Sequence, residues 1–245
     1  MKISIKSLFV ISALALTAAC GGGSGVTSVP APTPAPVTKP NTGAKPASTS
    51  TADLVAFAKG GGDSAVVRQD VLRISRDFQG GSVSFDTVAG SNAGLVAYTN
   101  ANGVTDYRIN GAARANIVVG SGGYDGPVQM TYRTSPNGAL KSADGDFSMS
   151  VDFGAGTVAT GGIAGNSSNV IEFFGDAKIA NGGFKDNATI VRLRNGQGEF
   201  IRDYTGTTNG IFVNGANGRD AAIGTLKATG LNLNGGFVAN ENIKK

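Results

Sequence analysis

The sequence contains no histidine and no tryptophan, and it has a single cysteine, Cys20. Without histidine, the Ser–His and Cys–His pairs that activate nucleophiles cannot form, and imidazole ligation of a metal is excluded. A single cysteine cannot form a disulfide within the fold. We therefore expect a protein that is not an enzyme, that has no cofactor or metal site, and that folds without disulfides.

Charge is also sparse, and its small basic excess is confined to the first part of the chain. The sequence has 21 basic and 17 acidic residues. Lys2, Lys6, Lys39 and Lys45 precede residue 53, and residues 53–245 hold the other 17 basic residues together with all 17 acidic ones. A neutral folded part attracts phosphates weakly, so we expect no nucleic-acid partner.

The first twenty residues have the pattern of a secretory leader. Lys2 and Lys6 precede an apolar run, Leu8–Leu16, which is too short to span a bilayer and closes on small residues before Cys20. The segment resembles a bacterial lipoprotein signal. That resemblance implies that residues 1–19 are cleaved and that Cys20 is acylated, so that lipid anchors the chain; Gly21 resembles the outer-membrane sorting class. An ordinary leader with an incidental cysteine is the alternative.

Residues 20–52 are poor in apolar side chains and rich in proline, serine and threonine. Such a composition cannot build a core. Pro30, Pro32, Pro34 and Pro36 alternate with other residues, which favours an extended polyproline-like chain. Behind a lipid anchor, we interpret this segment as a disordered tether. A docking ligand for an aromatic groove is the alternative.

Glycine, at 38 residues, separates many short apolar runs, which is typical of an all-β protein. In residues 53–126, which we expect to form a strand-rich segment, the candidate strands are Ala65–Ser75, Ser82–Val88, Leu95–Asn100, Val104–Asn110 and Arg114–Val119. Asn102 and Gly103 suit a type I′ hairpin turn, which needs positive φ at both positions. Leu54–Lys59 predicts a helical turn with Asp53 as its cap.

The clearest local pattern is a β-hairpin over Asp144–Ala164. Phe147, Met149, Val151 and Phe153 alternate with small or polar residues, as in a strand with one buried face. Residues 154–156, Gly-Ala-Gly, supply the turn. The pattern predicts that Val151 points inward and that the serine before it faces water.

Strand signals recur regularly through residues 127–245. The candidate strands are Val128–Arg133, Asp146–Phe153, Gly156–Ile163, Asn169–Phe174, Ala177–Ala180, Thr189–Arg194, Gly210–Asn214, Ala221–Leu226 and Gly235–Ala239. About eight antiparallel strands leave two open edges unless the sheet closes, and eight strands enclose a space that side chains fill. We therefore predict a small eight-stranded antiparallel up-and-down β-barrel, with a β-sandwich as the alternative.

Three runs carry a resemblance to a known family: GDFSMSVDFGAGTVATGGIAG, NVIEFFGDAKIANGGF and GIFVNGANGRDAAIGTLKATGLNLNGGFVANE. Together, over residues 127–240, they resemble the C-terminal barrel domain of transferrin-binding protein B and its relatives, which are bacterial surface lipoproteins. The resemblance implies an outer-membrane lipoprotein, lipid-anchored at the cell surface, whose barrel binds a host or environmental protein or an iron-related ligand. A structural or accessory envelope lipoprotein without a ligand of its own is the alternative.

Loops at one end of such a barrel are the expected contact surface, because its walls are committed to core and solvent. We predict them at Thr134–Ala143 and Asn195–Thr208. The second offers Phe200, Arg202 and Tyr204 together, and aromatic and arginine side chains are the usual anchors of protein interfaces. In the alternative interpretation, Phe200 and Tyr204 merely close the barrel mouth.

Other patterns are better explained by the fold than by a site. Asp144, Asp146 and Asp152 are interpreted as the solvated face of a strand, and Arg192 and Arg194 as the outer face of another. A barrel inserted in a membrane would need strands of about nine to eleven residues and an aromatic girdle. Most candidate strands are shorter, and aromatic residues make up 7% of the chain.

Overall fold

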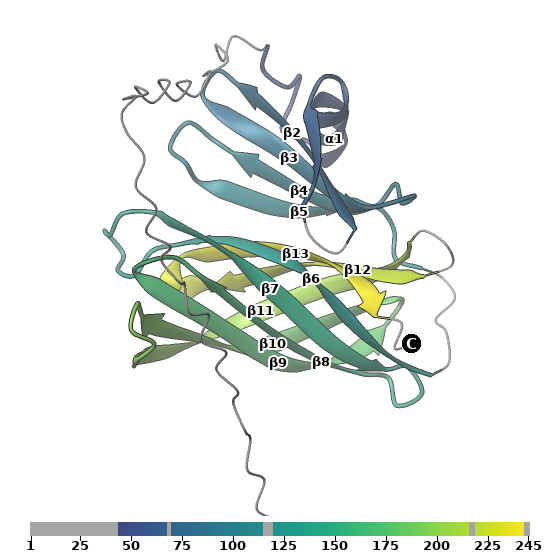
Figure 1. The fold of residues 1–245 in the computed structure, drawn as a ribbon, viewed down its shortest axis with the longest axis vertical. Helices are drawn as coiled ribbons and strands as arrows, with labels where there is room; N and C mark the ends of the chain where they lie inside the picture. Colours follow the sequence, from purple (N-terminus) through teal and green to yellow (C-terminus); the bar gives the residue numbers. More distant parts are fainter. Residues whose placement is uncertain (1–43, 68–69, 115–119, 216–218, 243–245) are drawn as a thin grey trace, which may run out of the picture. The chain divides into compact units, whose positions relative to one another are not determined.

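The structure is a computed structural model that describes residues 44–67, 70–114, 120–215 and 219–242. The predicted leader, Cys20, most of the predicted tether and residues 115–119 of one candidate strand lie outside these ranges. The described residues form a helix, a five-stranded sheet and a closed barrel (Figure 1).

The helix α1 (Thr51–Lys59) begins one turn earlier than the sequence predicts, and its cap is Ser50. Ser50 has an extended backbone, and its hydroxyl accepts a hydrogen bond from the Asp53 N–H at 3.2 Å. The same hydroxyl donates to the Asp53 carboxylate at 2.9 Å. The prediction that Asp53 is the cap was therefore wrong, because Asp53 lies in the first turn and supports the capping serine from there.

The sheet has the order β1-β2-β3-β4-β5, with every pair antiparallel. Its strands are β1 (Asp63–Val66), β2 (Val71–Phe78), β3 (Gly81–Val88), β4 (Gly94–Thr99) and β5 (Thr105–Asn110). The candidate strand Ala65–Ser75 is instead divided between β1 and β2, and Asp70, with a φ of 63°, immediately precedes β2. The chain reverses direction between these two strands, and the serine, aspartate and arginine residues of this stretch do not indicate that turn in the sequence.

The turn between β4 and β5 also differs from the prediction, although the hairpin itself is present. Gly103 has a φ of 74°, but Asn102 does not have positive φ, so the turn is not type I′. Asn100 holds the loop instead: its side-chain oxygen accepts hydrogen bonds from the N–H groups of Asn102, at 2.9 Å, and Val104, at 3.1 Å. A type I′ turn with both residues at positive φ occurs elsewhere, at Asn181 and Gly182.

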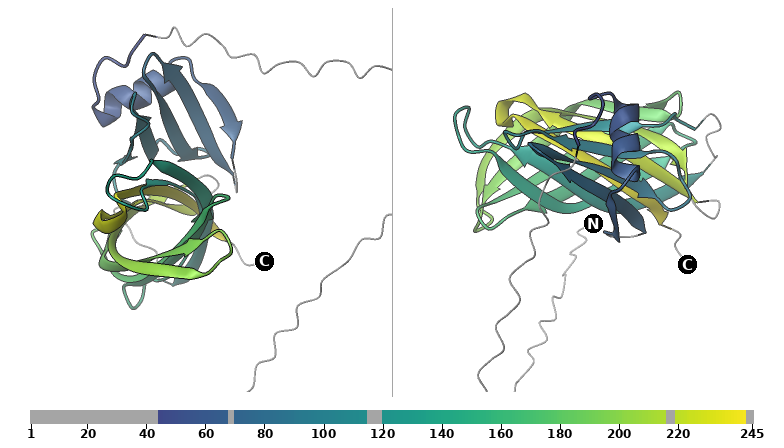
Figure 2. Two further views of the ribbon diagram at one scale, coloured as in Figure 1. Left: turned by 90° about the vertical axis from the view of Figure 1, so that its left-hand side faces the viewer. Right: turned by 90° about the horizontal axis from the view of Figure 1, so that it is seen from above.

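Eight antiparallel strands close into a barrel, which confirms the predicted fold class over the β-sandwich (Figures 1 and 2). They are β6 (Ser121–Tyr132), β7 (Lys141–Asp152), β8 (Thr157–Gly165), β9 (Asn169–Ala180), β10 (Gly183–Asn195), β11 (Phe200–Asn214), β12 (Asp220–Ala228) and β13 (Leu233–Asn242). Strands that follow one another in the chain are neighbours. The last strand pairs with the first, for example Phe237 with Val128, and this pairing removes both edges.

The predicted hairpin is formed by β7 and β8, with Val151 opposite Val158. Phe147, Met149 and Val151 are buried, while Ser148 and Ser150 are exposed, as the alternation predicts. The turn between the strands is closed by Gly156, with a φ of 67°. The inward and outward faces of this hairpin are therefore as the sequence indicates.

The barrel interior is filled with apolar side chains. Phe147 stacks on Phe237 with ring centroids 3.8 Å apart, and Phe147 and Phe173 are 6.1 Å apart. In barrels inserted in membranes, the apolar side chains instead face outward to lipid. The strands here run from 9 to 15 residues, so the argument that they are too short for a membrane was wrong. The strand ends are rich in glycine, serine and threonine, which are also common turn residues, and this hides their full length in the sequence.

A second apolar cluster lies between the sheet and the outer surface of β12 and β13. Leu95 and Tyr107 from the sheet pack with Ile223 and Val238 from the barrel. Helix α1 packs with other sheet residues in a separate cluster, so both faces of the sheet are covered.

Within the described residues, no helix combines the length and apolar character needed to cross a bilayer.

A buried carboxylate links the sheet and the barrel beside that cluster. Asp86 of β3, 2% exposed, accepts two hydrogen bonds from the Arg73 guanidinium, each 2.8 Å long. The side-chain amide of Gln129, in barrel strand β6, donates a third at 2.7 Å. Arg73 lies in the sheet and Gln129 in the barrel, so contact between the two completes the hydrogen bonding of this carboxylate.

Candidate functional site

The two predicted contact loops lie at the same end of the barrel. Because the strands alternate in direction, the β6–β7, β8–β9, β10–β11 and β12–β13 connections share one end. The first connection spans residues 133–140, close to the predicted Thr134–Ala143. The second predicted loop, Asn195–Thr208, is much shorter than expected, since β11 begins at Phe200. Its threonines, which the sequence interpretation assigns to the loop, are good strand formers.

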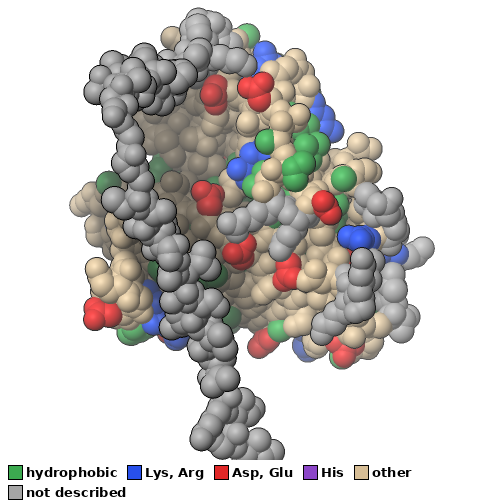
Figure 3. Space-filling model, viewed as in Figure 1, with side chains coloured by type: hydrophobic (Ala, Val, Ile, Leu, Met, Phe, Trp, Pro, Cys, Tyr) green, Lys and Arg blue, Asp and Glu red, His purple; other side chains and the backbone are tan. Residues whose placement is uncertain are grey.

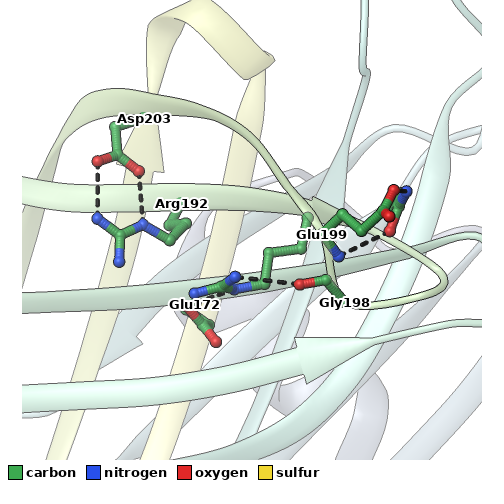
Figure 4. Close-up of polar contacts among 7 residues, drawn as sticks. Glu172, Arg192, Gly198, Glu199 and Asp203 are labelled. Carbon is green, nitrogen blue, oxygen red and sulfur yellow. Dashed lines mark hydrogen bonds and ion pairs between the residues drawn. The ribbon is translucent and has the colours of Figure 1, made fainter.

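The β10–β11 turn is held by its own polar groups. The Asn195 side-chain oxygen accepts hydrogen bonds from the N–H groups of Gln197, at 3.0 Å, and Glu199, at 2.8 Å. Gly198 has a φ of 83°, and its carbonyl accepts from the Arg194 guanidinium at 3.0 Å (Figure 4). A turn with this many internal bonds presents the following residues in a fixed position.

The three predicted site residues follow that turn but do not face the same way. Phe200 is 58% exposed, and Arg202 is also exposed. The Tyr204 ring is half-buried against the barrel core, and a Cβ added to Gly230 would lie 2.6 Å from it. The Arg202 guanidinium lies 5.5 Å from the centre of that ring. Tyr204 thus closes the barrel end, and Arg202, opposite buried Leu193, is exposed there on the same inward face. Phe200, opposite Arg194, lies on the outer face.

The sequence interpretation missed that Arg192 orders the surface beside Phe200. Arg192 of β10 donates two hydrogen bonds to Asp203, of 2.8 and 2.9 Å (Figure 4). Its guanidinium lies 5.3 Å from the ring centre of Phe174 and 5.5 Å from that of Phe200. The hydrogen bonds from Arg192 lower the pKa of Asp203, and the same bonds raise the pKa of Arg192. Both shifts favour the charged forms, so the pair stays ionised well below neutral pH.

Arg194 and Glu172 form a second pair on the same surface. The Arg194 Nε lies 3.0 Å from a Glu172 carboxylate oxygen, which makes an ion pair. The angle does not suit a hydrogen bond, so this buried Nε has no hydrogen-bond partner. Arg192 and Arg194 do lie on the outer side of β10, as expected. The sequence could not show their partners, because these depend on the register of β9 and β11.

Exposed apolar side chains gather around these pairs. The structure has seven exposed large hydrophobic side chains among the described residues, and five of them belong to strands β8–β11. These five are Ile163, Phe174, Ile190, Phe200 and Ile201. The register places Ile190 opposite Phe174, and Ile163 opposite Glu172. We call these five residues, with Arg192, the outer-wall patch. Clustered exposed apolar side chains are common at interaction sites, so the outer-wall patch is the candidate site.

The aspartates of β7 lie on the strand next to β8, and Asp146 is directly opposite Ile163 of the outer-wall patch. Asp144, Asp146 and Asp152 belong to the strand and contribute to its polar face. Figure 3 shows acidic side chains spread across the face that is turned to the viewer. Within the described ranges, no group of three histidine, cysteine, aspartate or glutamate residues could hold a metal ion. All three aspartates are exposed, which agrees with their interpretation as the solvated face of a strand.

These features define a small side-chain-filled antiparallel β-barrel that carries an additional sheet and an apolar, arginine-containing patch on its outside. No family model matches the chain, and no curated protein sequence matches it. Among solved structures, the chain is similar to a mutant of the vaccine antigen transferrin-binding protein B from Actinobacillus pleuropneumoniae H49. The TM-score is 0.40 and the identity 14%, over 74% of this chain and 81% of that one.

Proposed function

We propose that this protein is an outer-membrane lipoprotein, anchored by acylated Cys20, that displays its barrel at the cell surface to bind a protein partner. The observation that carries the proposal is the outer-wall patch, in which the exposed Phe200 ring lies beside the Arg192 guanidinium. Aromatic and arginine side chains dominate the binding energy of protein interfaces. The filled interior leaves the outside of the barrel as the binding surface.

The proposed role is non-enzymatic and needs no cofactor. The sequence resemblance to transferrin-binding protein B makes transferrin the first partner to test, and an iron-related ligand the wider class. The filled barrel also suits a structural envelope protein without a ligand. The exposed patch favours binding instead, because a purely structural barrel has no need to expose five large apolar side chains.

Replacing Cys20 with serine should release the protein from the membrane. A lipid chain is the anchor that the sequence indicates, and without acylation the leader and tether provide no other. The measurement is sedimentation of the full chain with membranes, with the wild type as reference. A variant that still sediments with the membrane fraction would contradict the lipoprotein proposal.

Protease added to intact cells should cleave the protein, because the proposal places the barrel at the cell surface.

The purified full chain carrying Cys20→Ser should capture its partner from serum or from iron-limited medium. Phe200→Ser should weaken that capture and leave the melting temperature nearly unchanged, because the ring is exposed. Lys227→Gln, at the one exposed position of β12, is the control. Protection from protease until the outer membrane is opened would favour the periplasmic accessory role.

A further inference from the structure

A shallow hollow in the outer wall of the barrel adjoins the outer-wall patch. Its volume is about 370 Å³, and its middle is formed by Ser148 of β7 and Gly161 of β8, which lie directly opposite each other. Ile163, 49% exposed, lines the hollow, and Phe174 lies opposite Gly161 on the next strand. Two small residues therefore leave a space beside two exposed apolar side chains of the patch.

The backbone does not require glycine at position 161. Gly161 does not have positive φ, and a Cβ added there would meet its nearest atom, the Phe173 carbonyl oxygen, at 3.8 Å. Contact at this distance is ordinary, so a side chain would be tolerated. The lack of a side chain at this position is what keeps the hollow open.

The lining of the hollow carries three carboxylates. Asp146 of β7 and Glu172 of β9 lie on either side of Ile163, and Asp125 of β6 also lines the hollow. The side-chain amide of Asn242 donates a hydrogen bond to Asp125, which orients this carboxylate and leaves its charge in place. The described residues that line the hollow include no lysine and no arginine.

The charges around these carboxylates narrow the kind of group that can dock. Arg194 lies 3.0 Å from Glu172 and offsets its charge, and Arg192 is paired with Asp203 (Figure 4). Asp125 is met by a neutral amide instead. A surface dense in phosphates, such as an anionic membrane or a nucleic acid, would be repelled by this lining, whereas a cationic side chain is complementary to it.

We propose that the hollow takes a lysine or arginine side chain of a partner protein, and that apolar residues next to it in the partner pack on the outer-wall patch. The aliphatic stem of such a side chain can lie over Gly161 against Ile163, while its charged head reaches Asp125. The adjacent apolar residues pack on Phe174 and Ile190, which lie opposite each other. This inference rests on the proposed function, namely that the barrel binds a protein, and it names the chemistry of the partner.

The test selects a displayed library of short random peptides on the purified full chain carrying Cys20→Ser. Enriched peptides should place a lysine or arginine beside aromatic or aliphatic residues. In a synthetic copy of an enriched peptide, replacing that basic residue with glutamine should weaken binding about tenfold, as expected for losing a charged hydrogen bond.

Two variants of the protein separate the charge of the hollow from its space. Asp125→Asn keeps an oxygen that can accept from Asn242 but removes the charge, and it should weaken peptide binding about fivefold. Its cost should shrink when the peptide already carries glutamine, because both changes remove the same ion pair. Gly161→Val should weaken binding about tenfold by filling the space, with the melting temperature nearly unchanged, since a Cβ there has room.

Asp77→Asn is the matched control and should leave peptide affinity unchanged, because Asp77 is exposed on β2 of the sheet and removes the same charge away from the hollow. Selection that yields no peptides, or peptides without a basic residue, overturns the inference. So does binding that either Asp125→Asn or Gly161→Val leaves unchanged, an equal loss for Asp77→Asn, or self-association through the patch.

The same variants separate this inference from the proposed function. If serum or medium yields a partner whose capture Phe200→Ser weakens while Asp125→Asn and Gly161→Val do not, the proposed function stands and this inference fails. If neither capture nor selection succeeds, both fail.

Discussion

Val151→Asp should lower the free energy of unfolding by about 3 kcal/mol or more, since it buries a carboxylate without a partner. Val151 is 2% exposed and belongs to the apolar barrel core. Across the hairpin it faces Val158, which offers no hydrogen bond from its side chain. The barrel must therefore either admit water at this point or protonate the new carboxyl group.

Ser150→Asp is the control at the adjacent position. Ser150 is exposed, so the same new charge stays in water and the change should remain within about 0.5 kcal/mol. Denaturant unfolding of the two variants at neutral pH measures the difference. Equal midpoints would contradict the difference in burial between the two faces of β7, and a larger loss for Ser150→Asp would show that the faces are reversed.

Gly145→Ala should destabilise the barrel by about 3 kcal/mol, at the upper end of the usual cost of overpacking. A Cβ at Gly145 would collide with the Ile163 carbonyl oxygen and lie 2.6 Å from the Ala164 Cα. Both atoms belong to the backbone of the paired strand β8, so no side-chain rotation can make room. The strands would have to separate at the place where the barrel wall is continuous.

Gly161→Ala provides the matched comparison on the same hairpin. The nearest atom to a Cβ there is the Phe173 carbonyl oxygen, at 3.8 Å, which is an ordinary contact. We expect Gly161→Ala to be close to neutral in thermal unfolding. A large loss for Gly161→Ala, or none for Gly145→Ala, would contradict the close approach of β7 and β8 at Gly145.

The closed barrel could be predicted because its signals are local and repeated. Alternation at Phe147, Met149 and Val151 gives one strand, and the count of such strands demands closure. The start of β11 could not be predicted in this way, because Phe200–Thr208 lacks a clean alternation. The register shift between Leu193 and Arg194 places Phe200 opposite Arg194, and this offset is invisible in the sequence.

The residue types of the candidate site could be predicted from the sequence, but the arrangement of their side chains could not. Phe200 and Arg202 could be identified because aromatic and basic residues follow a turn. The part played by Arg192 depends on three strands being in register, since Phe174, Arg192 and Asp203 come from β9, β10 and β11. Tyr204 is grouped with its neighbours in sequence, although the half-buried ring packs against the barrel end.

The sharing of Asp86 between Arg73 and Gln129 has a consequence for how the chain melts. The outward side chains of β12 that meet the sheet, Ala221 and Ile223, are fully buried. Separation of the barrel from the sheet would therefore expose this apolar surface to water, and Asp86 would lose the hydrogen bond that Gln129 donates. We expect sheet and barrel to lose their structure in one cooperative transition, with no stable barrel-only intermediate. Cleavage of the chain between β5 and β6 should then yield two fragments that aggregate and do not fold independently.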